Sequence, residues 1–284
     1  MPRDAPLSLP AWRGRRLSEN GVVRDPREGV APDGSIVTGA DRRAVPPEFE
    51  PVLAALSARL AEWPAVTAYL YGSVATGQAR AGRSDVDVLT VGLPEERALS
   101  IGSELSVRFA DLCREVAIAA ASPDDLTADG DEAYGMRVFV KHYCTRLSGP
   151  DRARALPRFR ADASAARGFN GDVDRHLASW RRAVDQRDPE LLGRQVARKT
   201  LLAAAGLVSV LDSTWTADRE LAADRWASHR PEAAAGLRQL RSWAAVESSA
   251  DHESVVACLA PGGLVEQVVE DFRAAVGLWS PPRR

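Results

Sequence analysis

The sequence predicts an α/β domain followed by an all-α helical bundle. Hydrophobic runs rich in β-branched and aromatic residues, which are typical of strands, occur at residues 65–71, 85–91 and 114–121. Helically spaced apolar residues separate these runs, and no strand pattern follows the Ser-Gly-Pro-Asp break at 148–151. We therefore expect three segments: an irregular N-terminal arm at 1–45, an α/β domain at 46–150 and a helical bundle domain at 151–284.

The α/β domain begins with a predicted helix. The arm before it is rich in Pro, Gly, Arg and Asp and shows no period, whereas Pro46 opens a stretch with helix-start chemistry and helical spacing. The pattern is helical again between Pro94 and Cys113. Residues 132–147 fit either a helix that leads into a strand or a mostly extended segment.

The bundle domain shows helical apolar spacing in six stretches. They lie at roughly 157–168, 172–187, 189–211, 217–228, 231–246 and 262–277. Turn sequences such as Phe-Asn-Gly-Asp and Pro-Gly-Gly separate some of them. The stretch at 189–211 is the most apolar of the second half.

Composition disfavours several classes of partner. The formal net charge is −2, so we do not expect nucleic acid or an anionic membrane as the partner. The three cysteines are widely spaced, which predicts neither a zinc site nor a disulfide framework. No apolar run approaches the ~20 residues of a membrane helix, and none follows Arg15 and Arg16 as an export signal would require. We expect a cytoplasmic protein, and its oligomeric state stays open.

Two aspartates stand one residue apart inside a hydrophobic strand pattern. Because strand side chains alternate between faces, Asp85 and Asp87 point the same way, while Val86 and Val88 point into packing. Neighbouring carboxylates repel each other unless a cation lies between them, and their hard oxygens favour one or two Mg²⁺ ions. A lone Asp-x-Asp is more often a solvated edge or a cap, so its meaning depends on the surrounding pattern.

A glycine-bearing turn precedes these aspartates. Gly72 and Ser73 follow a hydrophobic strand, and there the backbone N–H groups and the hydroxyl could hold a phosphate. Ser84, in the loop before Asp85, is a further candidate for nucleotide binding. Taken alone, a Gly-Ser pair is a turn in most proteins.

A third carboxylate begins the strand pattern at 114–121. Glu115 has the small residues Ala117 and Ala119 on its own face, which leaves room for a ligand. If this strand lies beside the one that carries the aspartates, Glu115 can join the same cluster.

Residues 71–91, YGSVATGQARAGRSDVDVLTV, resemble the signature of the DNA polymerase β-like nucleotidyltransferase superfamily. That signature has Gly-Ser after a hydrophobic residue, then about a dozen residues, then Asp-hydrophobic-Asp-hydrophobic. Residues 114–120, REVAIAA, resemble the strand that supplies the third carboxylate, more closely in the aminoglycoside adenylyltransferase branch. The resemblance implies a nucleotidyltransferase-type mixed sheet with flanking helices, followed by a helical bundle.

The resemblance also implies a role for each residue of the motif. Gly72 and Ser73 would hold the β- and γ-phosphates of a nucleoside triphosphate, with ATP as the expected co-substrate. Asp85 and Asp87 would ligate one or two Mg²⁺ ions. Glu115 would be either the third ligand or the general base that takes the proton of an acceptor hydroxyl. A nucleoside monophosphate would then pass to the acceptor with release of pyrophosphate.

Lysine is rare in this chain. Of its 37 basic residues only Lys141 and Lys199 are lysines. Lys199 lies in the apolar stretch at 189–211, from which its ammonium could reach a phosphate. It could equally extend along a solvated face beside Arg198. The local structure at Lys141 is ambiguous, so Lys141 is the weaker candidate.

Three functions fit these patterns. We expect a Mg²⁺-dependent enzyme that transfers AMP or another nucleoside monophosphate to a hydroxyl of a small molecule. An aminoglycoside-like cation is one such acceptor, for which Asp172, Asp174 and Glu190 could supply negative charge. The alternatives are transfer to a protein or tRNA, as in toxin–antitoxin systems, and a nucleotide-binding regulator without catalysis. RNA would favour a basic stripe, which the sequence lacks.

Overall fold

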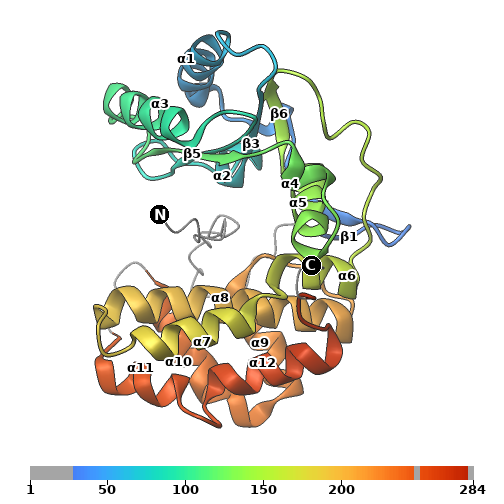
Figure 1. Ribbon diagram of the computed structural model, residues 1–284, viewed down its shortest axis with the longest axis vertical. Coiled ribbons are helices and arrows are strands. Elements are labelled where there is room, and N and C mark those ends of the chain that lie inside the picture. Colours follow the sequence, from blue (N-terminus) through green and yellow to red (C-terminus); the bar gives the residue numbers. More distant parts are fainter. Residues whose placement is uncertain (1–27, 246–249, 281–284) are drawn as a thin grey trace. The chain divides into compact units, whose positions relative to one another are not determined.

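The computed structural model describes residues 28–245 and 250–280 of the 284 residues, which form two compact units (Figure 1). The sheet unit comprises Ser35–Asp129 and Met136–Phe159. The helical unit comprises residues 28–34, 130–135, 160–245 and 250–280. Residue 150, where we expect the domain boundary, lies inside the sheet unit.

The sheet unit is built on a four-stranded mixed sheet. Its strands are β3 (Thr67–Tyr71), β4 (Val86–Val91), β5 (Val116–Ala121) and β6 (Thr145–Ser148). They lie in the order β5-β4-β3-β6; β3 is antiparallel to β4 and β6, whereas β4 and β5 are parallel. The crossover between the parallel pair contains α3 (Glu95–Arg108). The predicted α/β fold with a mixed sheet and flanking helices is therefore confirmed.

One face of the sheet packs against α1 (Glu50–Leu60) and α3 (Figure 1). Leu70 of β3 and Val86 and Val88 of β4 are fully buried there, in one cluster with leucines of both helices. Because strand side chains alternate, the opposite face carries Tyr71 and Asp87, which are partners in the β3–β4 register.

Helix α5 (Asp131–His142) supplies cover for this opposite face. Its residue Phe139 is fully buried, and its ring meets Tyr71 edge-on with 5.1 Å between the ring centroids. The segment 132–147, for which the sequence leaves two alternatives, is thus a helix followed by the strand β6.

Shorter elements complete the sheet unit. They are β2 (Ile36–Thr38), η1 (Arg42–Ala44), η2 (Pro47–Phe49), α2 (Gly72–Ala75) and α4 (Asp124–Thr127). The described part of the predicted irregular arm therefore contains regular structure, since β1 (Glu28–Val30), β2 and η1 lie in it. Residues 1–27 of that arm lie outside the described residues.

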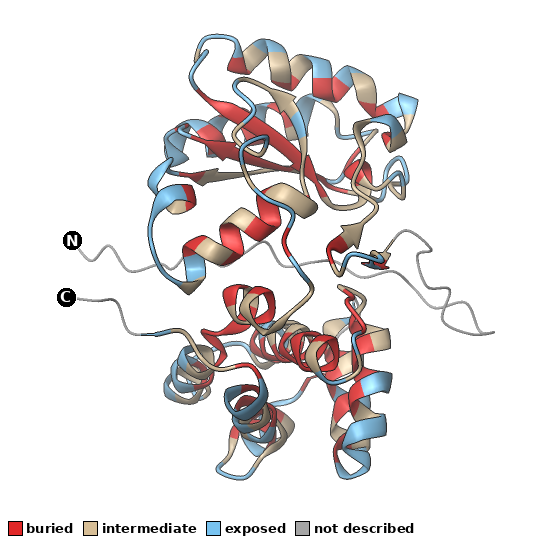
Figure 2. Cartoon of the chain, turned by 90° about the vertical axis from the view of Figure 1, so that its right-hand side faces the viewer, coloured by how far each residue is buried: buried red, intermediate tan, exposed pale blue. Residues whose placement is uncertain are grey.

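The long helix α8 (Pro189–Leu211) is the centre of the helical unit. Asp188 caps its start by accepting the Leu191 N–H at 2.8 Å, and Pro189 occupies its first position. It contacts α6 (Ala163–Asn170), α7 (Val173–Ala183), α9 (Arg219–His229), α10 (Ala234–Ala244), α11 (His252–Leu259) and α12 (Leu264–Ala275). Figure 2 shows buried residues along the inner sides of these helices, and the short η3 (Pro231–Ala233) precedes α10.

Two details of the helical unit differ from the sequence prediction. Helix α6 begins at Ala163 rather than near 157, because Asp162 caps it by accepting the N–H groups of Ser164 and Ala165. Helix α11 lies outside all six predicted helical stretches. Within residues 28–245 and 250–280, no helix combines the length and the apolar character needed to cross a bilayer.

Candidate active site

The two aspartates lie at the start of β4. Asp87 is the second residue of the strand and pairs with Tyr71 of β3 on one side and with Ala117 of β5 on the other. Asp85 directly precedes the strand and is 7% exposed, whereas Asp87 is half-buried. Burial and the negative charge of Asp87 raise the pKa of the Tyr71 phenol, so a protonated hydroxyl lies near this carboxylate.

Gly72 brings the turn after β3 against Asp87. Its φ is +72°, a left-handed backbone conformation that residues with a Cβ atom rarely adopt. A Cβ added at this position would lie 2.6 Å from the Asp87 Oδ2 atom. A glycine is therefore needed both for the backbone angle and for the close approach of the carboxylate. The Gly-Ser turn and the second aspartate of the 71–91 motif therefore meet at this point.

The serines of the motif hold the intervening loop. The Ser73 carbonyl accepts the N–H groups of Gln78 at 2.8 Å and Ala79 at 3.1 Å. The Ser84 hydroxyl accepts the Arg80 N–H at 2.9 Å. The Ser84 side chain thus has a structural role in closing the loop, and its predicted role in nucleotide binding stays a prediction.

Glu115 lies beside the aspartates along the sheet. Its carbonyl accepts the Val86 N–H at 2.9 Å, which continues the parallel β4–β5 register by one residue. The register places Glu115 beside Asp85 and Ala117 beside Asp87, so these residues share one face of the sheet. The strand that carries Glu115 therefore lies next to the strand of the aspartates, as the cluster would require, but the Glu115 side chain is exposed.

Arg114 is a residue of this site that the sequence analysis missed. Its Nη2 atom donates to Asp85 Oδ2 at 2.7 Å. The Asp85 side chain is 6% exposed and that of Arg114 is 42% exposed. The sequence does contain an indication of this pair. A buried carboxylate needs a cation nearby, and Arg114 directly precedes the third strand pattern.

The donor chemistry of the site fits Mg²⁺. Asp85 and Asp87 offer hard oxygens on one face of the sheet, and Mg²⁺ is usually bound by one or two carboxylates together with waters and substrate phosphates. The guanidinium on Asp85 shows that this carboxylate already accepts a cationic partner. Among the described residues, no group of three or more His, Cys, Asp and Glu side chains gathers as a metal site. Waters and substrate phosphates are the further ligands that Mg²⁺ usually takes.

Lys199 belongs to the helical unit, whereas the six other candidate residues belong to the sheet unit. Its Nζ atom is 2.6 Å from Asp172 Oδ1 and donates to the Phe169 carbonyl at 3.3 Å. The same aspartate lies 3.1 Å from the Nε2 atom of His176. Asp172, which the sequence offered as part of an acidic wall, is thus engaged by two basic side chains.

The pKa values of both members of this buried ion pair are shifted. Burial raises the pKa of Asp172, but the hydrogen bond from His176 and the charge of Lys199 outweigh it and lower the pKa to about 2. Burial lowers the pKa of Lys199, which the attraction of Asp172 only partly offsets. Asp172 is therefore ionised at neutral pH. The pair therefore stabilises the join between α7 and α8, and a phosphate role for Lys199 stays a prediction.

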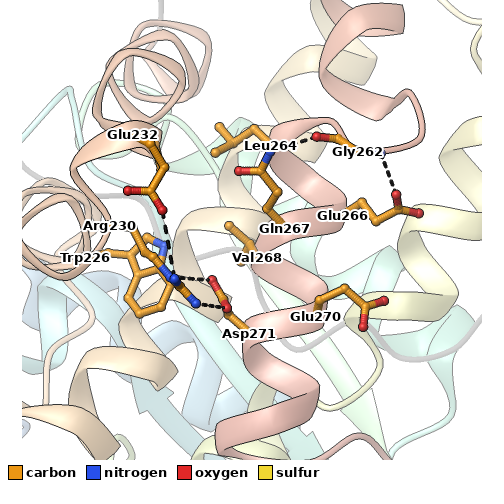
Figure 3. A pocket seen from close by; sticks show the side chains of 11 residues that line it. Trp226, Arg230, Glu232, Gly262, Leu264, Glu266, Gln267, Val268, Glu270 and Asp271 are labelled. Atoms are coloured by element: carbon orange, nitrogen blue, oxygen red, sulfur yellow. Dashed lines mark hydrogen bonds and ion pairs between the residues drawn. The ribbon is translucent and has the colours of Figure 1, made fainter.

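A hollow of about 420 Å³ lies in the helical unit, between α9 and α12 (Figure 3). Arg230 stands beside Trp226 on one wall and pairs with both carboxylate oxygens of Asp271. Across the hollow, Glu266 accepts the Gly262 N–H and pairs with Arg181. Much of the acidic charge around this hollow is thus compensated, and none of the predicted site residues lines it.

The comparisons with known proteins address the sheet unit. A model of the nucleotidyltransferase domain family matches residues 54–124, about a quarter of the chain. No curated protein matches the chain. The matched segment runs from α1 to the start of α4 and contains the Gly72 turn, both aspartates, Arg114 and Glu115. This part of the chain is therefore similar to nucleotidyltransferase domains.

Proposed function

We propose that the protein is a Mg²⁺-dependent nucleotidyltransferase that moves a nucleoside monophosphate, AMP from ATP, onto a hydroxyl of a small molecule. The observation that carries this proposal is the contact between the Gly72 turn and the Asp87 carboxylate, within a segment similar to nucleotidyltransferase domains. A phosphate held at the turn would lie next to a carboxylate able to hold a divalent ion.

Each residue of the site has a defined task in this reaction. Gly72 and Ser73 bind the β- and γ-phosphates, and Asp85 and Asp87 hold Mg²⁺. The ion, when bound, neutralises charge on the triphosphate and on the departing pyrophosphate. The acceptor oxygen forms a bond to the α-phosphorus while the bond from that phosphorus to the pyrophosphate oxygen breaks. The protein contributes position and charge stabilisation.

The acceptor's proton must leave as the new bond forms, and we assign its removal to Glu115. Its side chain is exposed beside the small residues Ala117 and Ala119, so an acceptor hydroxyl can approach it. Such access is needed because a general base must come within hydrogen-bond reach of the proton that it takes. Lys199 would be an additional phosphate contact only if its ammonium can serve a phosphate and Asp172 together.

A small acceptor is favoured over a nucleic acid by charge. The chain carries a net charge of −2, and its arginines do not form a dense run. A cationic acceptor such as an aminoglycoside would be compatible with this balance.

The test is a transfer assay on the full chain. The chain is incubated with Mg²⁺ and ATP, GTP or CTP labelled at the α-phosphate, together with a panel of hydroxyl-bearing small molecules, a tRNA pool and the chain itself as acceptors. We expect Mg²⁺-dependent release of pyrophosphate and label on a small acceptor, both lost in Asp87→Asn. Label on tRNA or on protein would overturn the small-molecule assignment. Nucleotide binding without pyrophosphate release under every condition would overturn catalysis.

A further inference from the structure

The carboxylate of Asp85 is almost enclosed, whereas its basic partner is not. The Asp85 side chain is 6% exposed, and the Arg114 side chain that reaches it is 42% exposed. A buried carboxylate is destabilised unless a cation or hydrogen-bond donors compensate it. The Arg114 Nη2 atom meets Asp85 Oδ2 at 2.7 Å, the distance of a charge-assisted hydrogen bond.

The backbone holds the two residues in place on neighbouring chain segments. The Arg114 N–H donates to the Ser84 carbonyl at 3.1 Å, and the Val86 N–H donates to the Glu115 carbonyl at 2.9 Å. These bonds lie on either side of Asp85. A separation of the ion pair therefore requires no strand movement, because the half-exposed guanidinium can rotate toward solvent on its flexible stem.

We propose that Arg114 is a positioning residue that occupies Asp85 in the metal-free protein and releases it when a divalent cation binds, an inference that rests on the metal site of the proposed function. A divalent ion on Asp85 would need the same oxygen that Arg114 now occupies, Oδ2. Repulsion between the guanidinium and the ion favours the state in which Arg114 has turned away.

Arg114 therefore has two effects of opposite sign. Without a divalent ion it stabilises the fold by compensating a buried charge. With the ion it competes for the same oxygen, Asp85 Oδ2, and weakens binding. A merely structural arginine would show the first effect and not the second.

The experiment measures Mn²⁺ binding to the full chain by electron paramagnetic resonance of the free ion, with and without a non-hydrolysable ATP analogue. The variants are Arg114→Gln, Arg114→Lys and, as a matched charge control, Arg108→Gln on α3, whose guanidinium lies over the Phe109 ring. We expect about tenfold tighter Mn²⁺ binding in Arg114→Gln, equivalent to ~1.4 kcal/mol. Arg114→Lys and Arg108→Gln should stay within about threefold of the wild type.

Melting temperatures provide the second readout. Arg114→Gln should melt below the wild type in EDTA, and the gap should close at saturating Mn²⁺. If Arg114→Gln does not fold, the wild type still decides the matter. Its Arg114 side-chain NMR resonance, identified by its loss in Arg114→Lys, should shift on addition of Mg²⁺ and should not shift in Asp87→Asn.

The possible failures are distinguishable. This inference is overturned if Arg114→Gln binds Mn²⁺ no more tightly than the wild type, or if the Arg114 resonance does not shift when Mg²⁺ is added. Either result leaves the nucleotidyltransferase proposal intact. Absence of any Mn²⁺ binding that depends on Asp87, even with the nucleotide analogue, overturns the metal site and both proposals together.

Discussion

The Asp87 carboxylate lies so close to the Gly72 backbone that a Cβ atom at residue 72 would collide with it. The distance from that Cβ position to Asp87 Oδ2 is 2.6 Å, and the backbone at Gly72 has a φ of +72°. One contact thus joins the turn after β3 to the first residues of β4, and most of the functional argument depends on it.

Gly72→Ala should disable the site with only a moderate loss of stability. The left-handed backbone should lower the free energy of unfolding by about 1–2 kcal/mol. The added methyl group also pushes the Asp87 carboxylate aside, so we expect transfer activity to fall about 100-fold or more. Urea denaturation and the labelled-ATP assay measure the two effects.

Gly82→Ala is the matched control for this change. Gly82 has a φ of +70°, but the nearest atom to an added Cβ is 3.7 Å away. It should therefore show the same loss of stability while its activity stays within about threefold of the wild type. Equal loss of activity in both variants would mean that the contact with Asp87 is unimportant.

The two aspartates should respond differently to neutralisation. From the sequence alone, relief of repulsion predicts that Asn at either position leaves the fold intact or stabilises it. The ion pair with Arg114 changes this expectation for Asp85. In metal-free buffer we expect Asp85→Asn to lose about 1–2 kcal/mol of unfolding free energy and Asp87→Asn to be neutral or more stable. Denaturant midpoints in EDTA decide the order, and the reverse order would contradict the arrangement at Asp85.

Lys199→Met should destabilise the helical unit strongly. It leaves the buried Asp172 carboxylate with one basic partner fewer, and loss of one member of a buried ion pair lowers stability by about 3 kcal/mol or more. Lys141→Met is the control, since the Lys141 ammonium donates to the neutral Ala153 carbonyl at 3.0 Å, and we expect a loss of about 1 kcal/mol. Similar losses in the two variants would argue against a structural ion pair at Lys199.

Acid should weaken the fold through Asp172. Its pKa is lowered from 3.8 to about 2 in the folded chain, so the folded state holds its proton less tightly than the unfolded state. The resulting stabilisation of about 2 kcal/mol is complete above pH ~4 and is lost as the pH falls from ~4 to ~2. The free energy of unfolding, measured by denaturation across this pH range, should depend less on pH in Asp172→Asn than in the wild type. An unchanged pH dependence in that variant would show that other carboxylates are responsible.

The sequence predicts the site as far as local patterns reach. Alternation along a strand predicts a common face for Asp85 and Asp87, a glycine after a strand pattern predicts the turn at Gly72, and helical spacing predicts α3. These features depend on neighbours in the chain, so spacing and residue type are sufficient to find them.

Long-range partners are harder to predict. The pair Arg114–Asp85 joins residues 29 positions apart, and Lys199–Asp172 joins two helices through side chains that periodicity does not orient. Helix α11, which Asp251 caps, was also missed. Each of these features depends on tertiary packing, which overrides local preference.

The most direct test is a crystal structure of the chain with Mn²⁺ and a non-hydrolysable ATP analogue, read by the anomalous signal of the metal. We predict a metal peak within coordination distance of Asp85 and Asp87, with the terminal phosphates on the Gly72–Ser73 turn and Arg114 turned away from Asp85. A nucleotide bound elsewhere, or a metal peak that does not touch Asp87, would contradict the account.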